Sequence, residues 1–542
     1  MDNARREELR PRFRRKISTF PLRIPNARFM QQLTDPYSPV PAASSDQPIK
    51  KVLVLGAGSA GLMAALALKR RVPGLDVGIV RSPDLGVIGV GEGTTAAFPK
   101  FVFEQLGLSP ADFYAKAQPT WKLGLKFLWG PRPAFYYTFE TEVAGFSKDL
   151  PKPRGFYCDP VGPLPPMGRI TALMMADRAF FRQPNGAPDL NINHAYHLEN
   201  RRLVAWLEAA ATTAGIPFTD GLVEGAETGP EGIRSLRLDG GRNLSADLYV
   251  DCSGFRSELA GKALGVPFAT FADTLFCDRA VIGGWDRGKE PVHPFTTCET
   301  MDAGWAWQIE HEHFINRGYV YSSAFISDAE ATAELLRKNP KITTTPRVVR
   351  FRSGRLQQSW TKNVVAMGNA SGFVEPLEAT SLQAIGTAAA NLADVIRESG
   401  GCPTPGLMRI FNAHENGKWD DIRDFLAVHY RFNTRLETPF WQHCQESTPL
   451  HGASGIVDYY QENGPLLQGA AHTLSRDNAF GLEGYYALLA GQGVPHRRPY
   501  QTPPNESAVW KQQASAWSQK AASALTVPQA LAALRDPRTR WG

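Results

Sequence analysis

Lys51-Val-Leu-Val-Leu-Gly-Ala-Gly-Ser-Ala-Gly-Leu-Met-Ala-Ala-Leu-Ala-Leu-Lys-Arg70 is the stretch that decides the fold of this 542-residue chain. Residues 52–55 form a short apolar run of strand type, residues 56–61 are rich in glycine, and the residues from Leu62 onward are strong helix formers. The stretch therefore predicts a strand, a tight turn and a helix.

The three glycines of the turn suit a dinucleotide phosphate. Gly56 can take the backbone angles of the turn, Gly58 leaves room for a pyrophosphate, and Gly61 lets the helix pack closely on the strand. The helix N-terminus then offers free N–H groups to the phosphate. The alternative is an ordinary strand-to-helix turn without a ligand. We predict the following cofactor-binding residues in this turn: Gly56, Ala57, Gly58, Ser59, Ala60 and Gly61.

Charge and composition exclude several classes of function. The chain is 43% hydrophobic and 21% charged, which is ordinary for a soluble globular protein, and no apolar run has the roughly 18 residues that a membrane span needs. The net charge of +6 arises within residues 1–51, which hold eleven Lys and Arg against five Asp and Glu. The rest of the chain is balanced, which argues against a nucleic-acid groove. We expect residues 1–48 to be a solvated, partly disordered extension, the alternative being contact with phosphate or an acidic partner.

The six cysteines are widely scattered and show no metal-ligand spacing. This distribution predicts free thiols in a cytoplasmic protein and no metal site. Residues 196–214 show a helical pattern. After the first helix, residues 76–80 read as a second strand. In a unit that binds NAD or FAD, an acidic residue at its end would bind the adenosine ribose, but Arg81 stands there. Either adenosine recognition is altered or Arg81 binds an extra phosphate, as in NADP binding.

A second glycine-rich loop, Gly89-Val-Gly-Glu-Gly-Thr-Thr95, precedes a further helix. It resembles the Val-Gly-Glu-Ala-Thr loop of flavin-dependent halogenases of the tryptophan-halogenase family, where the loop lies against the flavin. The resemblance implies that Glu92 and Gly93 contact the cofactor. Gly93 and Thr95 stand where the family pattern has alanine and isoleucine.

Residues 119–127 resemble the family segment that carries the catalytic lysine, which would be Lys122. Without the resemblance, Lys122 and Lys126 are an i, i+4 pair on one face, and most such lysines are solvated. The flanking Trp121 and Phe127 favour partial burial, which lowers the pKa of a lysine and makes it chemically usable.

Gly304-Trp-Ala-Trp-Gln-Ile-Glu310 and the following Gly318-Tyr-Val-Tyr-Ser-Ser323 match the Trp-x-Trp-x-Ile-Pro signature of the same family and the strand after it. Glu310 replaces the proline. Trp305 and Trp307 form either an indole wall between flavin and substrate, as the resemblance implies, or one buried face of a core strand.

Residues 362–382 match the third flavin element of the family, which implies cofactor contacts from Asn369 and Leu382. The resemblance makes Glu378 the catalytic glutamate and places the halide at Thr380 and Ser381, where the backbone enters a helix N-terminus. Read without the family, Glu378 is a carboxylate that interacts with the helix dipole. Ala379 replaces the serine of the family's Glu-Ser-Thr triplet, and Ser381 replaces a glycine.

A pair of tyrosines and a glutamate hold the free amino acid in tryptophan-specific members. The matching positions here are His429, Tyr430 and Leu436, and leucine offers no charge to an ammonium group, although Glu437 is adjacent. Free tryptophan is therefore not the expected substrate. The expected substrate and tunnel residues are Trp305, Trp307, His429, Tyr430, Phe440 and Trp441.

The resemblance implies an α/β fold with an FAD-binding module of the glutathione-reductase type over residues 49–400. A cap at about 129–195 and 270–345 interrupts the module, and residues 401–542 form a mainly helical substrate region. A separate flavin reductase would supply reduced FAD (FADH2) without a stable complex. Chloride or bromide would be the co-substrate and an indole, pyrrole or phenol the acceptor, and a homodimer stays open.

Three alternatives remain. A flavin-dependent aromatic monooxygenase would use the same cofactor module without halide, and Gly93, Glu310 and Ala379 keep this reading open. An NADPH-linked flavin reductase would use Arg81. A flavin-binding structural or sensor protein would need neither Lys122 nor Glu378.

Overall fold

The computed structural model describes residues 47–83, 86, 91–145, 164–497 and 502–535, all of which belong to one unit, Ser45–Gly542. Nearly all of the basic extension expected over residues 1–48 lies outside the described residues.

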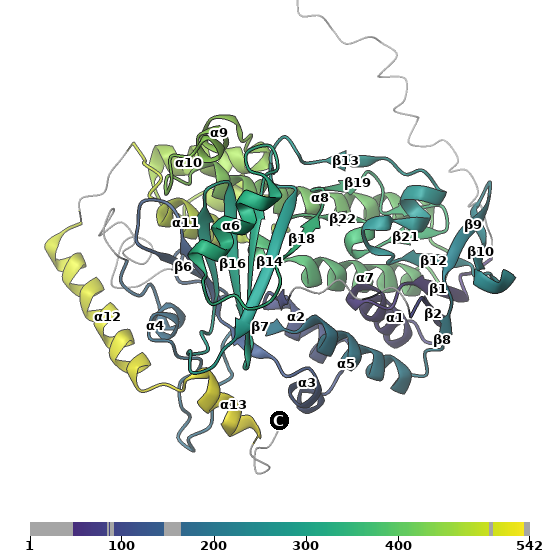
Figure 1. The fold of residues 1–542 in the computed structure, drawn as a ribbon, viewed down its shortest axis with the longest axis horizontal. Coiled ribbons are helices and arrows are strands. Elements are labelled where there is room, and N and C mark those ends of the chain that lie inside the picture. Colours follow the sequence, from purple (N-terminus) through teal and green to yellow (C-terminus); the bar gives the residue numbers. More distant parts are fainter. Residues whose placement is uncertain (1–46, 84–85, 87–90, 146–163, 498–501, 536–542) are drawn as a thin grey trace, which may run out of the picture. The chain divides into compact units, whose positions relative to one another are not determined.

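The glycine-loop stretch forms the centre of a six-stranded sheet, with the strand expected at 52–55 observed as β1. Its apolar residues 52–55 are buried, as in a central parallel strand. The following helix, α1, begins at Ser59 and packs against α5 and α7 (Figure 1). Only β20 runs antiparallel to its described neighbour. In sheet order the strands are β20 (Trp360–Thr361), β21 (Val364–Ala366), β12 (Leu248–Asp251), β1 (Lys51–Leu55), β2 (Asp76–Arg81) and β8 (Phe218–Asp220).

A seven-stranded sheet carries the Trp-x-Trp segment in its interior. Its Trp strand, β16, pairs antiparallel with both β15 and β17, and β15 runs parallel to β5. In sheet order the strands are β18 (Arg347–Arg350), β14 (Arg279–Asp286), β17 (Phe314–Tyr321), β16 (Gly304–Glu310), β15 (Thr296–Met301), β5 (Gly124–Leu128) and β6 (Phe135–Thr138).

A three-stranded sheet joins segments that are distant in sequence. Its strands are β3 (Glu92–Gly93), β7 (Ala195–Leu198) and β4 (Thr120–Lys122), and β7 pairs with both others. The pairing brings the second glycine loop and Lys122 together. Two further small sheets contain β11 (Asn243–Leu244), β10 (Gly232–Leu238) and β9 (Val223–Gly229), and β13 (Phe268–Thr270), β19 (Gly354–Leu356) and β22 (Gly372–Phe373).

Two local expectations from the sequence are wrong. The apolar pattern from Tyr196 reads as helix, but residues 195–198 form β7 because they pair with strands on both sides, and α5 begins only at Asn200. Lys122 and Lys126 do not share a helical face. They lie on β4 and β5, which Leu123 separates.

Helices cover the first sheet and build the C-terminal region. The longest, α8, begins where Thr404 accepts a hydrogen bond from the Leu407 N–H and Pro405 occupies the first turn. It packs against α7, α9 and α11. The helices are α1 (Ser59–Arg71), α2 (Ala97–Pro99), α3 (Pro110–Lys116), α4 (Arg169–Met175), α5 (Asn200–Thr213), α6 (Asp328–Lys338), α7 (Ser381–Glu398), α8 (Pro405–Arg431), α9 (Pro439–Ser447), α10 (Ser454–Asn463), α11 (Gly481–Gly491), α12 (Pro504–Ala522) and α13 (Val527–Arg535).

The two large sheets have separate apolar cores. The first core lies between the β1 sheet and helices α1, α5 and α7, and the second lies between the β16 sheet and helices α8 to α11. The expected α/β class with a mainly helical C-terminal region is confirmed.

Candidate active site

The glycine turn between β1 and α1 lines a groove of about 860 Å³. Gly56 has a φ of +110°, and a Cβ there would lie 2.5 Å from the Cys252 carbonyl oxygen. A Cβ at Gly61 would lie 1.8 Å from the Gly56 oxygen, so both positions need glycine. A Cβ at Gly58 would meet no atom within 4 Å, so this residue borders open space.

This groove has the chemistry of a dinucleotide site. Helix α1 starts at its edge without a side-chain cap, so N–H groups of the first turn are left for a ligand phosphate. Two more loops contribute to the groove, as the sequence predicts, whereas Gly61 packs behind it. The expected cofactor residues that line it are Gly56, Ala57, Gly58, Ser59, Ala60, Arg81, Glu92, Asn369 and Leu382.

Arg81 already has two carboxylate partners. Its Nε donates to Asp220 Oδ1 at 2.7 Å and its Nη1 donates to Glu208. These hydrogen bonds, from Asp220 first, raise the pKa of Arg81. A phosphate bound here would compete with both carboxylates, which gives no support to an NADPH site.

A second cavity, of about 150 Å³, adjoins the groove and is lined by several of the predicted site residues. The two share Glu92, Phe255, Asn369 and Ser381 as lining residues. Lys122, Trp307 and Thr380 belong to the second cavity. The groove and the cavity that contains Lys122 therefore lie next to each other.

Lys122 is fully buried on β4. Its Nζ donates a hydrogen bond to the Thr94 carbonyl oxygen at 3.1 Å and lies 5.5 Å from the centre of the Phe139 ring. Burial lowers the pKa of Lys122 to about 8, although the charge of Glu378 opposes this effect. The amine therefore changes charge near physiological pH.

Two departures from the family pattern lie against each other beside this lysine. A Cβ at Gly93 would lie 3.2 Å from the Ala379 Cβ and 3.6 Å from Lys122 Nζ. Glycine at 93 and alanine at 379 thus leave the lysine amine more open than larger residues would. Burial raises the pKa of the neighbouring Glu92 to about 7.

The turn before α7 presents Glu378 and the predicted halide residues. Ala379 has a φ of +54°, which reverses the chain between Glu378 and the helix. Thr380 is the N-cap of α7 and makes no side-chain capping bond, and it lines the second cavity with Ser381. The backbone here suits an anion.

Glu378 is buried, and its Oε1 lies 2.8 Å from Nε2 of His429. The sequence predicts that His429 contacts substrate, but the structure places its ring against Glu378. The other ring nitrogen, Nδ1, donates to the Phe425 carbonyl oxygen at 3.0 Å. Nothing in the sequence indicates this contact, because the two residues are 51 positions apart.

The two tryptophans of the signature have different surroundings. Trp307 lines the second cavity, whereas Trp305 is fully buried and donates from Nε1 to Glu375 Oε2 at 2.7 Å. Tyr430 donates its hydroxyl hydrogen to the same oxygen. Burial raises the pKa of Glu375 to about 7.

Phe440 and Trp441, expected at the substrate, are fully buried in the second core. The Trp441 indole donates to the Met301 carbonyl oxygen at 2.7 Å and stacks on Tyr430, with ring centres 5.7 Å apart. Neither aromatic lines the groove or the second cavity. Both rings pack against Tyr430 instead.

Glu310, which replaces a proline, forms a buried ion pair with Arg287. Arg287 Nη2 donates to Glu310 Oε2 at 2.5 Å, and Gln308 Nε2 donates to Oε1 at 2.7 Å. Exposure is 4% for the arginine side chain and 0% for the glutamate. Such a pair depends on both partners, because removing one leaves a buried charge.

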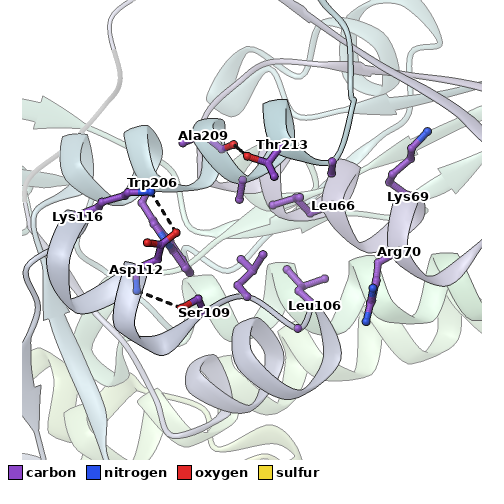
Figure 2. Close-up of a pocket in the computed structure, with 14 residues that line it drawn as sticks. Leu66, Lys69, Arg70, Leu106, Ser109, Asp112, Lys116, Trp206, Ala209 and Thr213 are labelled. Carbon is purple, nitrogen blue, oxygen red and sulfur yellow. Dashed lines mark hydrogen bonds and ion pairs between the residues drawn. The ribbon is translucent and has the colours of Figure 1, made fainter. Parts of the chain in front are cut away.

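A third cavity, of about 470 Å³, lies beyond the C-terminal half of α1, between α3 and α5 (Figure 2). Trp206 lines it, and Lys116 Nζ forms an ion pair with Asp112 Oδ2 at 3.1 Å. It contains none of the predicted site residues, so it does not belong to the active site.

Across the described ranges, the side chains form no cluster of three or more potential metal ligands. In the same part of the chain, no helix has the length and apolarity for a membrane crossing.

Comparison with known proteins agrees with this geometry. The sequence model of the family described as "Tryptophan halogenase" matches residues 51–504. The chain belongs to this family. Its resemblance to the family, predicted from separate motifs, is therefore confirmed, and the chain is a flavin-dependent halogenase. The monooxygenase and reductase alternatives are not favoured.

Individual members of the family show how far the similarity extends. The tryptophan 7-halogenase RebH of Lentzea aerocolonigenes is 30% identical over 489 residues, which cover 82% of this chain and 90% of RebH. The structure of MibH, a lathipeptide tryptophan 5-halogenase, is 37% identical, with a TM-score of 0.81 over 92% of this chain and 96% of MibH. BrvH, a flavin-dependent halogenase from Brevundimonas sp. BAL3, is 30% identical, with a TM-score of 0.78 over 90% of this chain and 99% of BrvH.

Proposed function

We propose that this halogenase uses reduced FAD, O2 and a halide ion to make hypohalous acid, which Lys122 and Glu378 direct at an electron-rich aromatic ring. The observation that carries the proposal is the position of Lys122. Its amine is buried on the wall of a cavity that adjoins the dinucleotide groove.

Residues of the groove fit the flavin dinucleotide. The open space at Gly58 and the uncapped start of α1 suit the pyrophosphate, and Glu92, Asn369 and Leu382 continue the groove toward the second cavity. When bound, reduced flavin with O2 supplies the oxidising equivalents that convert halide to hypohalous acid. We propose that a separate reductase delivers the reduced cofactor without a stable complex, and the paired state of Arg81 supports this.

The halide would lie at the start of α7. The N–H groups of the first helical turn lack a capping side chain, and Thr380 and Ser381 both line the cavity. An anion at this place gains from the helix dipole. It also lies in the same cavity as Lys122, to which its oxidised product must pass.

Lys122 would activate the oxidant. As an ammonium group it donates a hydrogen bond to the oxygen of hypohalous acid, and its proton goes to that oxygen as the aromatic ring attacks the halogen. Water leaves, and the carbon–halogen bond forms. The ring then loses its proton to the carboxylate of Glu378. As the product leaves, Glu378 releases this proton to water and the amine takes one up from water, which restores both groups. The buried setting strengthens these interactions because little water screens them.

We expect an indole ring in a substrate other than free tryptophan, with a pyrrole or phenol as the next candidates. MibH is described as a lathipeptide tryptophan 5-halogenase, and RebH as a tryptophan 7-halogenase. In this chain His429 is bonded to Glu378 and Tyr430 to Glu375, so both side chains face interior carboxyl groups. Leu436 carries no charge. These three positions therefore present no side chain that would bind the ammonium group of free tryptophan.

The test is mass spectrometry of products formed with FAD, a flavin reductase, NADH, O2 and bromide. The panel contains free tryptophan, a tryptophan-containing peptide, indole and a phenol, each with a bromide-free control. We expect a bromine isotope pattern on the peptide or on indole and little on free tryptophan. A gain of oxygen alone would favour the monooxygenase. No product from any substrate, while the flavin is reoxidised normally, would contradict the proposed substrate class.

A further inference from the structure

We infer that His429 is a positioning residue that holds the Glu378 carboxylate away from the Lys122 amine. The inference rests on the proposed function, because it assigns a task to a residue behind the two proposed catalytic groups. It comes from one hydrogen-bonded chain that runs from the backbone of α8 through the imidazole to Glu378.

The contacts of His429 fix its proton arrangement. The Phe425 carbonyl oxygen can only accept a hydrogen bond, so Nδ1 of His429 carries a hydrogen. The contact between Nε2 and Glu378 Oε1, at 2.8 Å, then needs one further proton. That proton makes either an imidazolium that faces a carboxylate or a neutral imidazole that accepts from a carboxylic acid. Both forms tie the same oxygen of Glu378 to the ring.

Aromatic rings enclose the imidazole. The ring centres of Phe127, Phe425 and Trp129 lie 5.4, 5.1 and 6.2 Å from that of His429. The histidine side chain is fully buried, so its ring has little freedom to turn away from Glu378.

The surroundings of Glu378 show why its hydrogen bond to His429, here called the tether, matters. The titratable groups that sense the charge of Glu378 are Lys122, Tyr137 and Cys298. In a dry pocket an ammonium group and a carboxylate attract each other strongly. Yet the hydrogen bond that Lys122 makes goes to the Thr94 carbonyl oxygen, while Glu378 is bonded to His429. The tether leaves Lys122 free to bind the oxidant and Glu378 free to accept a ring proton.

The sequence also explains why a histidine is needed here. Position 379, next to the glutamate, is alanine where the family pattern has serine. Within the described part of the chain, His429 is the side chain that hydrogen-bonds to Glu378. The imidazole supplies from α8 a contact that no neighbouring hydroxyl provides.

Two variants of His429 separate positioning from packing. His429→Leu removes the hydrogen bond, whereas His429→Gln keeps a donor for Glu378. His414→Leu is the matched control, because His414 lies on the same helix about four turns earlier and is bonded to Asn391 instead. All four proteins are studied without cofactor by NMR of lysine labelled with ¹³C at Cε, and Lys122→Met assigns the Lys122 signal.

We expect Lys122 to titrate near pH 8 in the wild type, in His429→Gln and in His414→Leu. In His429→Leu the freed carboxylate approaches the amine, which moves the midpoint up by at least about one pH unit. Bromination by His429→Leu should fall at least about thirtyfold, with partial rescue in His429→Gln. An unchanged midpoint in His429→Leu overturns the inference. An equal loss of activity in His429→Leu and His429→Gln without a moved midpoint shows packing alone and also overturns it.

The titration needs neither flavin nor substrate. It therefore decides the inference even where the proposed function fails. A wild type that brominates no aromatic substrate would refute the proposed function while leaving the tether between His429 and Glu378 measurable.

Discussion

Burying Lys122 lowers the free energy of unfolding of this protein. The variant Lys122→Met should therefore be more stable than the wild type but unable to halogenate. The side chain is fully buried, and burial lowers its pKa from 10.5 to about 8. Because one pKa unit corresponds to about 1.4 kcal/mol, keeping this lysine in the folded state costs about 3 kcal/mol near pH 7. Methionine loses the hydrogen bond to Thr94, which is worth about 1 kcal/mol, so a net gain of about 2 kcal/mol remains.

The gain in the free energy of unfolding that Lys122→Met brings should decrease as the pH rises. The unfolded chain keeps the lysine proton up to about pH 10.5, whereas the folded protein releases it at about pH 8. The free energy of unfolding of the wild type therefore rises with pH between these values, and this rise is absent in Lys122→Met. The cost of about 3 kcal/mol for burying the lysine is full below about pH 8 and vanishes above about pH 10.5, so Lys122→Met loses its advantage over the wild type at high pH.

Urea unfolding of the cofactor-free proteins near pH 7 and near pH 10 measures this difference. Lys126→Met is the matched control, because Lys126 is partly exposed on β5 with its amine 5.6 Å from the centre of the Phe295 ring. We expect no gain in stability from that substitution and no loss of halogenation. A Lys122→Met variant that is no more stable than the wild type near pH 7, or that keeps its full gain in stability near pH 10, would show that the buried lysine does not destabilise the folded protein.

Three further predictions follow from the site. Gly58→Ala should fold normally yet bind FAD at least about tenfold more weakly in a fluorescence titration, because its methyl group enters the open groove, whereas Gly61→Ala should yield little folded protein. The bromination rate should fall as pH rises through about 8, as the Lys122 ammonium is lost; a rate that rises instead would point to a haloamine on the neutral amine. Arg287→Met should lower the free energy of unfolding, measured by thermal unfolding, by about 3–5 kcal/mol, because it leaves the buried carboxylate of Glu310 without its charged partner. The double variant with Arg287→Met and Glu310→Leu should recover most of that loss.

Local signals in the sequence predict the part of the fold that binds the cofactor. The strand, glycine turn and helix at residues 51–71 depend on neighbouring residues, and the steric demands at Gly56 and Gly61 are visible in the pattern itself. The same holds for the start of α7 after the Pro376–Ala379 turn. Such features need no knowledge of distant parts of the chain.

Contacts between distant segments are not readable from one sequence. Residues 195–198 resemble the start of a helix, and only pairing with β3 and β4 makes them a strand. The sequence leaves open whether Arg81 binds a phosphate, and only the pairing of β2 with β8 shows that Asp220 lies beside it. The contact between His429 and Glu378 depends on how α8 lies across the turn before α7, which no periodicity encodes.

The role of Lys122 is tested most directly by the amount of brominated product formed per O2 consumed, measured for the wild type and for Lys122→Met with reduced FAD and bromide. Because Lys122 is proposed to act on the oxidant after it forms, O2 consumption should be nearly unchanged in the variant. The yield of brominated product per O2 should fall at least about a hundredfold. A variant that brominates with the wild-type yield would contradict the central role of Lys122.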